Sequence, residues 1–247
     1  MPVSVDTVYQ RVLALANKEQ RGYITPQEFN LFANQAQMDI FEQYFYDLNQ
    51  FRMVPGNDTV YADMVNILED KIDVFRDTFG SSATSGFTAQ GSGYTLPDTV
   101  YRMEQVRIGG TQCEKLTVKD YNTVRESPLT KPSPSRPIYT IRSGNTILIN
   151  DGVSDGGTGY VDFTSTNINI YFIRKPVRVE WTYVIVGDVA LVNPDETVGY
   201  QDFELHDSEE TDLVIKILGL AGITLKDPNL YQIASSEDNK NIQQEKQ

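Results

Sequence analysis

The sequence predicts an α+β protein in which helical segments from the two ends of the chain pack together around an inserted antiparallel β domain. Three observations carry this prediction. Apolar residues recur at helical spacing near the start of the chain, alternate with polar residues in its middle, and return to helical spacing near its end. We therefore expect a helical domain over 1–79 with 200–247, a flexible arm over 80–95 and a β domain over 96–199.

The composition excludes several classes of protein. With 247 residues, 40% apolar and 11% aromatic, the chain has enough core-forming residues for one large or two small domains. A single Cys cannot form an internal disulfide, and one Cys with one His cannot build a Cys-rich or multi-His zinc site. The sequence shows no secretion signal and no apolar run of about 18 residues, so we expect a soluble protein made in the cytoplasm.

The charge is concentrated toward the two ends of the chain. There are 34 acidic and 21 basic residues, which give a net charge of −13. Residues 1–80 contribute −6, residues 81–199 contribute −1, and residues 200–247 contribute −6. This acidity argues against non-specific binding to duplex DNA, because such binding needs clustered Lys and Arg to displace counterions.

Capping signals and apolar spacing predict three helices in the N-terminal part. Either Ser4 or Asp6 can cap the first helix, because each side chain can accept from the free N–H groups of the opening turn. The second helix begins at the capping box Thr25-Pro-Gln-Glu28 and runs to about Gln50. A Pro-Gly-Asn-Asp turn then precedes a third helix, whose apolar face continues to Phe79.

Two features of this part leave room for contacts with other chains. The second helix carries a wide aromatic stripe that suits core packing and also a subunit interface, for which Phe41, Tyr44 and Phe45 are candidates. The Gly- and Ser-rich segment after the third helix is typical of a flexible linker. Alternatively, it is an extended arm that orders against a neighbour through Phe87 and Tyr94.

Turn residues divide the middle of the chain into hairpins. Gly109-Gly110 and Ser143-Gly-Asn145 each separate two short alternating runs, which predicts two tight hairpins. Residues 117–125 are predicted to form a short helix between them. Cys113 follows the first of these turns, and we interpret it as a small buried apolar residue rather than a nucleophile.

The longest strand-like runs come next, at 167–174 and 177–186. Pro176 lies between them and favours a turn or an edge position, since proline cannot donate to a sheet. Trp181, in the second run, is the only Trp of the chain and is predicted to lie in the core of the β domain.

No motif for catalysis, a metal or a cofactor is found. The loop that begins at Asp151 resembles a calcium-binding EF-hand loop only loosely, because Val153 stands where an oxygen ligand is needed; a solvated hairpin tip is the simpler interpretation. The only His, His206, lies beside Asp207 at a helix start, where capping explains it. We predict no catalytic residue, no metal and no cofactor.

The C-terminal part predicts one helix followed by a polar tail. Acidic residues at 207–210 favour a helix N-terminus, and Leu213 and Ile217 lie on the apolar face of that helix. We also count Leu213 and Ile217 among the candidates for a subunit interface. A second segment starts at Pro228. Its apolar residues are Leu230, Tyr231 and Ile233.

Several short segments share their order and spacing with a known family. They are Leu96-Pro97, Thr99-Val-Tyr-Arg102, the Gly-Gly hairpin, Arg136-Pro-Ile-Tyr139 and Lys175-Pro176. This part resembles the β domain of head-to-tail adaptor proteins of short-tailed phages, also called tail tubular or gatekeeper-type proteins. Residues 8–26 and 29–33 look like the neck-ring proteins of marine and gut crAss-like phages. The resemblance spans roughly residues 5–233.

The resemblance implies a structural virion protein, not an enzyme, that assembles into a ring of roughly twelve copies beneath the portal. Its partners would be further copies of itself, the portal and adjacent ring or tail proteins. We expect the C-terminal segment to dock on the portal or on a neighbouring subunit through Leu230, Tyr231 and Ile233. DNA would pass through the lumen without sequence-specific binding, and we hypothesise that part of the acidity lines this channel and keeps DNA from adhering. The alternative is a host-surface or peptidoglycan-active protein, a binding module or lysin.

Overall fold

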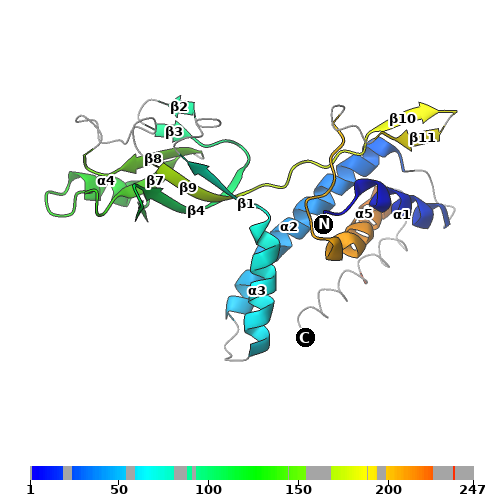
Figure 1. The fold of residues 1–247 in the computed structure, drawn as a ribbon, viewed down its shortest axis with the longest axis horizontal. Coiled ribbons are helices and arrows are strands. Elements are labelled where there is room, and N and C mark those ends of the chain that lie inside the picture. Colours follow the sequence, from blue (N-terminus) through cyan, green and yellow to red (C-terminus); the bar gives the residue numbers. More distant parts are fainter. Residues whose placement is uncertain are drawn as a thin grey trace. The chain divides into compact units, whose positions relative to one another are not determined.

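The chain has an α+β fold made of two compact units (Figure 1). The computed structural model describes residues 2–18, 24–53, 59–80, 88–90, 93–143, 145–153, 168–187, 189–193, 199–224 and 236. The helical unit combines both ends of the chain, Met1–Val74 and Pro176–Gln247, and the β unit is the continuous stretch Phe75–Lys175 between them. The domain boundaries predicted from the sequence, at 79, 96 and 199, differ from the unit boundaries of the structure, which lie after Val74 and after Lys175.

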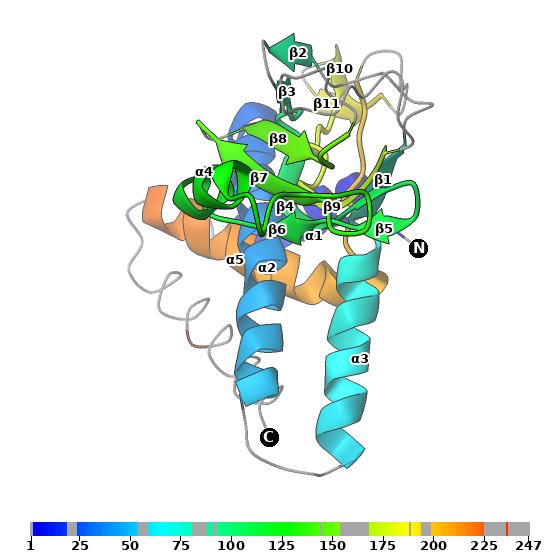
Figure 2. The ribbon, with the colours of Figure 1, turned by 90° about the vertical axis from the view of Figure 1, so that its left-hand side faces the viewer.

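The helical unit is built around one long helix. Its described elements are α1 (Val5–Lys18), α2 (Pro26–Met53), α3 (Thr59–Asp73), the hairpin strands β10 (Tyr183–Val186) and β11 (Val189–Val192), the short 3-10 helix η2 (Asp207–Glu209) and α5 (Glu210–Thr224). Helix α2 packs against α3 and α5, and α1 packs against α5. Figure 2 shows α2 and α3 side by side. Because α5 comes from the C-terminal part of the chain, the long helix α2 contacts elements from both ends of the chain.

The predicted capping box at the start of α2 is confirmed. The backbone N–H of Glu28 donates to the hydroxyl oxygen of Thr25 at 3.3 Å, and the Glu28 carboxylate accepts from the backbone N–H of Thr25 at 3.0 Å. These reciprocal bonds satisfy two N–H groups that have no partner within the helix. They also lower the pKa of the Glu28 carboxyl, because both the backbone and the hydroxyl of Thr25 donate to its ionised form.

The start of α1 depends on the opposite end of the chain. The backbone N–H of Val5 donates to the carboxylate of Asp202 at 2.8 Å, and the N–H of Phe203 donates to the carbonyl of Val3 at 3.2 Å. Asp6, one of the two predicted caps, instead accepts from the indole N–H of Trp181 at 2.9 Å. The two ends of the chain are therefore hydrogen-bonded together within one unit.

The third helix is shorter than the sequence predicts. Helix α3 ends at Asp73, and β1 (Arg76–Gly80) follows it and pairs with β9 (Ile168–Arg174). Phe79 was assigned to the helix face, but it stacks on Phe172 of the β unit, with ring centroids 4.6 Å apart. Its spacing of four residues from Phe75 fits a helix and an alternating strand equally well, so the pattern did not discriminate between them.

The described residues of the β unit form two sheets. Besides β1 and β9, the unit comprises β2 (Thr88–Gln90), β3 (Gly93–Thr95), β4 (Val100–Ile108), β5 (Thr111–Gln112), β6 (Glu114–Lys115), α4 (Val118–Glu126), β7 (Ile138–Arg142) and β8 (Thr146–Asn150). One sheet has the order β1-β9-β4-β5 and the other β2-β3-β8-β7-β6. Pairing is antiparallel except between β6 and β7, which α4 connects in parallel.

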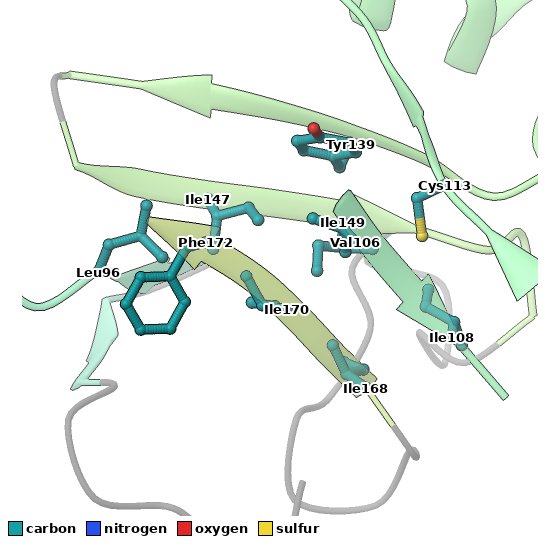
Figure 3. Close-up of a cluster of buried hydrophobic side chains, with 10 residues drawn as sticks. All are labelled: Leu96, Val106, Ile108, Cys113, Tyr139, Ile147, Ile149, Ile168, Ile170 and Phe172. Carbon is teal, nitrogen blue, oxygen red and sulfur yellow. The ribbon is translucent and has the colours of Figure 1, made fainter. Parts of the chain in front are cut away.

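The core of the β unit lies between the two sheets (Figure 3). Alternate residues of β8 face different neighbours: Ile147 and Ile149 point into this core, whereas Leu148 packs under α4 with Tyr121 and Ile138. Three consecutive apolar residues therefore occur in this strand, because both of its faces are buried. The ten buried residues are Leu96, Val106, Ile108, Cys113, Tyr139, Ile147, Ile149, Ile168, Ile170 and Phe172.

Two predicted turns and one predicted helix are confirmed in this unit. Gly109 and Gly110 connect β4 to β5 with φ of 53° and 92°, which glycine adopts without strain. Strands β7 and β8 pair as the second hairpin. The short helix α4 begins after Thr117, whose hydroxyl accepts from the backbone N–H of Asp120 at 3.3 Å.

Part of the predicted flexible arm belongs to a sheet. Of residues 80–95, Gly80 ends β1, 88–90 form β2 and 93–95 form β3, which pairs with β8. A Cβ on Gly93 would lie 2.5 Å from a methyl carbon of Leu148 and 2.8 Å from the carbonyl oxygen of Ile147. Glycine at 93 therefore allows close packing of two strands, a role that composition alone does not distinguish from flexibility.

Candidate functional site

Three amide side chains on α2 take the place of a partner strand. Asn30 accepts from the backbone N–H of Trp181 at 3.0 Å and donates to its carbonyl at 3.3 Å. Asn34 does the same with Val179, at 2.9 Å and 2.8 Å. Four residues of helix rise about 6 Å and two residues of strand about 6.7 Å, so side chains at i and i+4 match alternate residues of an extended segment.

Gln37 continues this amide ladder, which we define as Asn30, Asn34 and Gln37. Its amide donates to the carbonyl of Val177 at 2.8 Å and accepts from the N–H of Glu204 at 3.2 Å. The predicted strand 177–186 is thus wrong in its first half: this half is extended but hydrogen-bonds to α2, and only Tyr183–Val186 form strand β10. Sequence reasoning missed the ladder, although its amides lie at spacings of four and three on one helix face.

Trp181 anchors this segment in the core of the helical unit, not in the β domain as predicted. Its side chain is buried, and its ring centroid lies 4.0 Å from that of Tyr9 on α1. Tyr183, the first residue of β10, stacks on Trp181 with centroids 5.6 Å apart. Thr182 and Asn193 close the base of the hairpin, because the N–H of Asn193 donates to the carbonyl of Thr182 at 2.9 Å. The hairpin therefore starts from a fixed base.

Beyond this base extends the hairpin β10–β11 (Figure 1). It exposes apolar side chains on both of its faces. Its register pairs Val184 with Leu191 on one face and Ile185 with Ala190 on the other. Five of the fifteen exposed large apolar side chains in the described part of the chain lie here, with exposed fractions of 37–67%: Val184, Ile185, Val186, Leu191 and Val192. We call these five residues the hairpin patch.

The structure places most described candidates for a subunit interface inside the fold. In the helical unit, four are buried: Phe41, Tyr44, Leu213 and Ile217. Phe45 is half-buried and packs edge-on against Phe41, with centroids 5.1 Å apart. Tyr94 packs against the core of the β unit. An interface through these residues stays a prediction, whereas the side chains of the hairpin patch are exposed in the described structure.

The remaining candidates lie outside the described residues. They are Phe87 in the predicted arm and the three apolar residues of the C-terminal segment, Leu230, Tyr231 and Ile233. The same holds for most of the loop compared with an EF-hand, since residues 154–167 are not described. Among the described residues, no three His, Cys, Asp or Glu side chains are grouped so that they could hold a metal ion.

The single His and the single Cys have structural surroundings. His206 caps η2, where its ring nitrogen accepts from the backbone N–H of Ser208 at 3.2 Å, as predicted. Cys113 is buried in the core of the β unit, and burial raises the pKa of its thiol to about 12, with a further contribution from the carboxylate of Asp151. A protonated, buried thiol is a poor nucleophile.

Among the ion pairs in the described part of the helical unit, the pair of Lys71 and Glu209 has the most buried carboxylate. The ammonium of Lys71 on α3 lies 2.6 Å from the carboxylate of Glu209, which is only 6% exposed, and 5.4 Å from the ring centroid of Tyr44 on α2. The pair therefore joins α3 to η2, which directly precedes α5, and Tyr44 lies alongside on α2. No helix in the described part of the chain is both long and apolar enough to span a membrane.

The two units differ strongly in charge. The sequence of the helical unit contains 25 acidic and 10 basic residues, a net charge of −15. The β unit contains 9 acidic and 11 basic residues, a net charge of +2. The unit boundaries of the structure thus separate the charges more sharply than the predicted boundaries, because the acidic segment after Lys175 belongs with the helices.

Comparison with protein-family models gives no match for this chain, and no curated protein matches it either. A functional proposal therefore depends on the residues and geometry described above. The two features that bear on it are the construction of the helical unit from both ends of the chain and the exposed hairpin patch on that unit.

Proposed function

We propose that this chain is a structural virion protein that forms a ring in the head-to-tail connector of a bacteriophage, between portal and tail. The observation that carries the proposal is the discontinuous helical unit, closed by both chain ends, with the β unit inserted as one continuous stretch. This is the arrangement that the resemblance to adaptor and neck-ring proteins implies. The partners proposed are other copies of the chain, the portal and adjacent ring or tail proteins.

Self-association is the physical core of the proposal. Monomeric proteins seldom expose contiguous apolar patches, and those that do commonly use them to bind another protein. The hairpin patch is such a surface, and its fixed base at Trp181 limits the ordering entropy that association would cost. A ring requires each copy to present two different surfaces that meet head to tail and close by rotation.

The proposal gives the chain no catalytic step and no base-specific contact with DNA. The helical unit, at a net charge of −15, repels a polyanion rather than binding it. We propose that acidic residues of this unit line the channel of the ring, where they would let DNA pass without adhering. Mobility-shift assays with duplex DNA at low salt should accordingly detect no complex.

Electron microscopy of the purified full-length protein tests the proposal directly. We expect closed rings with roughly twelve-fold symmetry in negative stain, and mass photometry should show a matching population of oligomers. Addition of the phage's purified portal should produce ring pairs. A chain that remains monomeric at every concentration, with and without portal, would contradict the proposal, as would clearing of a cell-wall zymogram.

A further inference from the structure

We propose that the hairpin patch binds the β unit of a second copy of this chain. The inference rests on the proposed ring for its biological setting, but its argument uses only the surface chemistry of the two units. It identifies one of the two surfaces that a head-to-tail contact requires and the unit on the neighbouring copy that receives it.

The hairpin needs a partner that covers both of its faces. An isolated two-stranded hairpin is marginally stable in water, and three or more strands or a packed layer are usually needed. Here Ile185 is 67% exposed on one face, and Val184 and Val186 are exposed on the other. Each edge strand also presents backbone groups to which a further strand can pair. A partner that pairs with an edge and packs on the side chains would satisfy both needs.

Charge decides which partner fits. Residues 183–192 contain one charged residue, Asp188, so the patch itself is nearly neutral. The unit that carries it has a net charge of −15, which repels nucleic acid, anionic lipid headgroups and the helical unit of another copy. The β unit, at +2, is the part of a second copy that the acidic unit attracts.

The β unit also offers suitable surfaces for such a contact. Its two sheets end in the strands β1, β5, β2 and β6, so each sheet has two edges. Its exposed basic residues include Lys119 and Lys131. Because the hairpin patch and the β unit are different surfaces of one chain, their contact is heterologous, and it generates rings or filaments rather than closed pairs.

Cross-linking from the hairpin tests which surface receives it. The one native thiol, Cys113, is buried, so Ile185→Cys can be labelled selectively with a benzophenone maleimide in the full-length protein. In a mixture of unlabelled and ¹⁵N-labelled copies, we expect mixed-isotope cross-links from residue 185 to peptides of residues 75–175. Cross-links to residues 1–74 or 176–247 of a second copy would overturn the inference.

Two sets of variants make the test quantitative. Ile185→Ser with Val186→Ser should weaken association by roughly tenfold or more, because a few apolar anchor residues supply most of the binding energy of such contacts. The control is Leu31→Ser on α2, where the side chain is 65% exposed; it should change association less than about twofold. Lys119→Glu with Lys131→Glu reverses the charge of the β unit and should weaken association at about 50 mM salt, but much less at about 500 mM. Unchanged association in either double variant would count against the inference.

The outcomes also separate this inference from the ring proposal. Closed rings in micrographs, with cross-links that avoid the β unit, would overturn the inference and leave the ring. Cross-links to the β unit of a second copy, without closed rings, would do the reverse. If vesicles of phosphatidylcholine carry the wild-type protein in flotation and fail to carry the Ile185→Ser, Val186→Ser variant, the occupant is lipid and the inference is wrong.

Discussion

The β unit and the helical unit assemble their cores in different ways. The β unit takes every core residue from one continuous stretch, Phe75–Lys175, and its strands alternate between two buried faces. The helical unit joins residues that are far apart in sequence. Many of these long-range contacts are hydrogen bonds of polar side chains. Asp202 caps α1 by accepting from a residue 197 positions away, and Asn30 and Asn34 bind backbone groups 151 and 145 positions away.

This difference shows in which unit the core can be predicted from local sequence patterns. A sheet built from a continuous segment repeats a short period, so its core can be predicted from a few residues at a time. A unit closed by side-chain amides and carboxylates has no such period, because one Asn on a helix face looks like any solvated Asn. The helical unit should therefore depend more on a few polar contacts, and the β unit more on the volume of its apolar side chains.

The largest effects should come from truncating one core aromatic in each unit. Phe41→Ala and Phe172→Ala each remove a fully buried ring and should each cost about 3–5 kcal/mol of unfolding free energy in their own unit. Each unit has its own natural reporter, Trp181 fluorescence for the helical unit and Cys113 thiol reactivity for the β unit. We expect Phe41→Ala to shift the fluorescence transition in urea and Phe172→Ala to increase thiol labelling.

The control for this pair is the reporter in the other unit. Each variant should leave the opposite reporter near its wild-type value, since each ring packs in a separate core. If both reporters move together in both variants, the two units unfold as one and the comparison fails. Phe41→Ala also separates two interpretations of this residue, because an interface residue would change association without changing the fluorescence transition.

Much of the fold could be predicted from local signals. The capping box at Thr25 and Glu28, the Gly109-Gly110 turn and the helix after Thr117 are confirmed because each depends on residues within four positions of one another. Trp181 was correctly predicted to be buried, but in the wrong unit. Its surroundings come from α1 and α2, and nothing near it in sequence indicates them.

The remaining differences have physical causes that sequence patterns do not resolve. The spacing between Phe75 and Phe79 suits two kinds of element, and Gly93 serves close packing where composition indicated flexibility. Of the hairpin patch, the sequence predicts only Val184, Ile185 and Val186 as strand, and period and β-branching do not tell whether another layer covers a strand. The described aromatic candidates for an interface are buried or half-buried, because Phe41, Tyr44 and Phe45 pack within the helical unit and Tyr94 packs against the core of the β unit.

The next largest effect is expected from the amide ladder. Asn34→Ala removes the acceptor and the donor that serve Val179, which is buried, and should cost about 3 kcal/mol of unfolding free energy because two backbone groups lose their partners. Urea unfolding followed by Trp181 fluorescence measures this loss. Gln35→Ala is the matched control, since its side chain is exposed on the same helix and should change stability by less than about 0.5 kcal/mol. Equal effects of the two variants would show that the ladder is not what holds the segment.

Ion pairs should contribute unequally in the two units. Lys71→Met leaves Glu209 with its charge in a buried site and should cost about 2 kcal/mol. Arg136→Met breaks the pair with Glu114, in which both side chains are about half exposed, and should cost less than about 0.5 kcal/mol. Fluorescence reports the first change and thiol labelling the second. A larger cost for Arg136→Met than for Lys71→Met would contradict this part of the comparison.

The smallest effects on stability should come from the caps of helices α2 and α4. The effect of the α2 cap should depend on pH, which distinguishes it from the larger effects above. Glu28→Gln removes a carboxylate whose pKa is lowered in the folded chain by donors on Thr25. A lowered folded-state pKa stabilises the fold above the ordinary value of 4.5, and this stabilisation is lost as pH falls through the folded-state pKa. The wild type should therefore be more stable than Glu28→Gln at neutral pH, and the two should converge in acid.

The corresponding cap in the β unit sharpens this last prediction. Asp120 is one methylene shorter than Glu28, and its carboxylate accepts from the hydroxyl of Thr117 at 2.7 Å, while the Glu28 carboxylate also accepts from a backbone N–H. Asp120→Asn should then change thiol labelling of Cys113 without changing Trp181 fluorescence, and Glu28→Gln should do the opposite. Both caps are exposed, and each contacts only its own helix. If either variant changed both reporters, a structural change at one helix end would have to reach the other unit. The conclusion that the two cores are separate would then have to be abandoned.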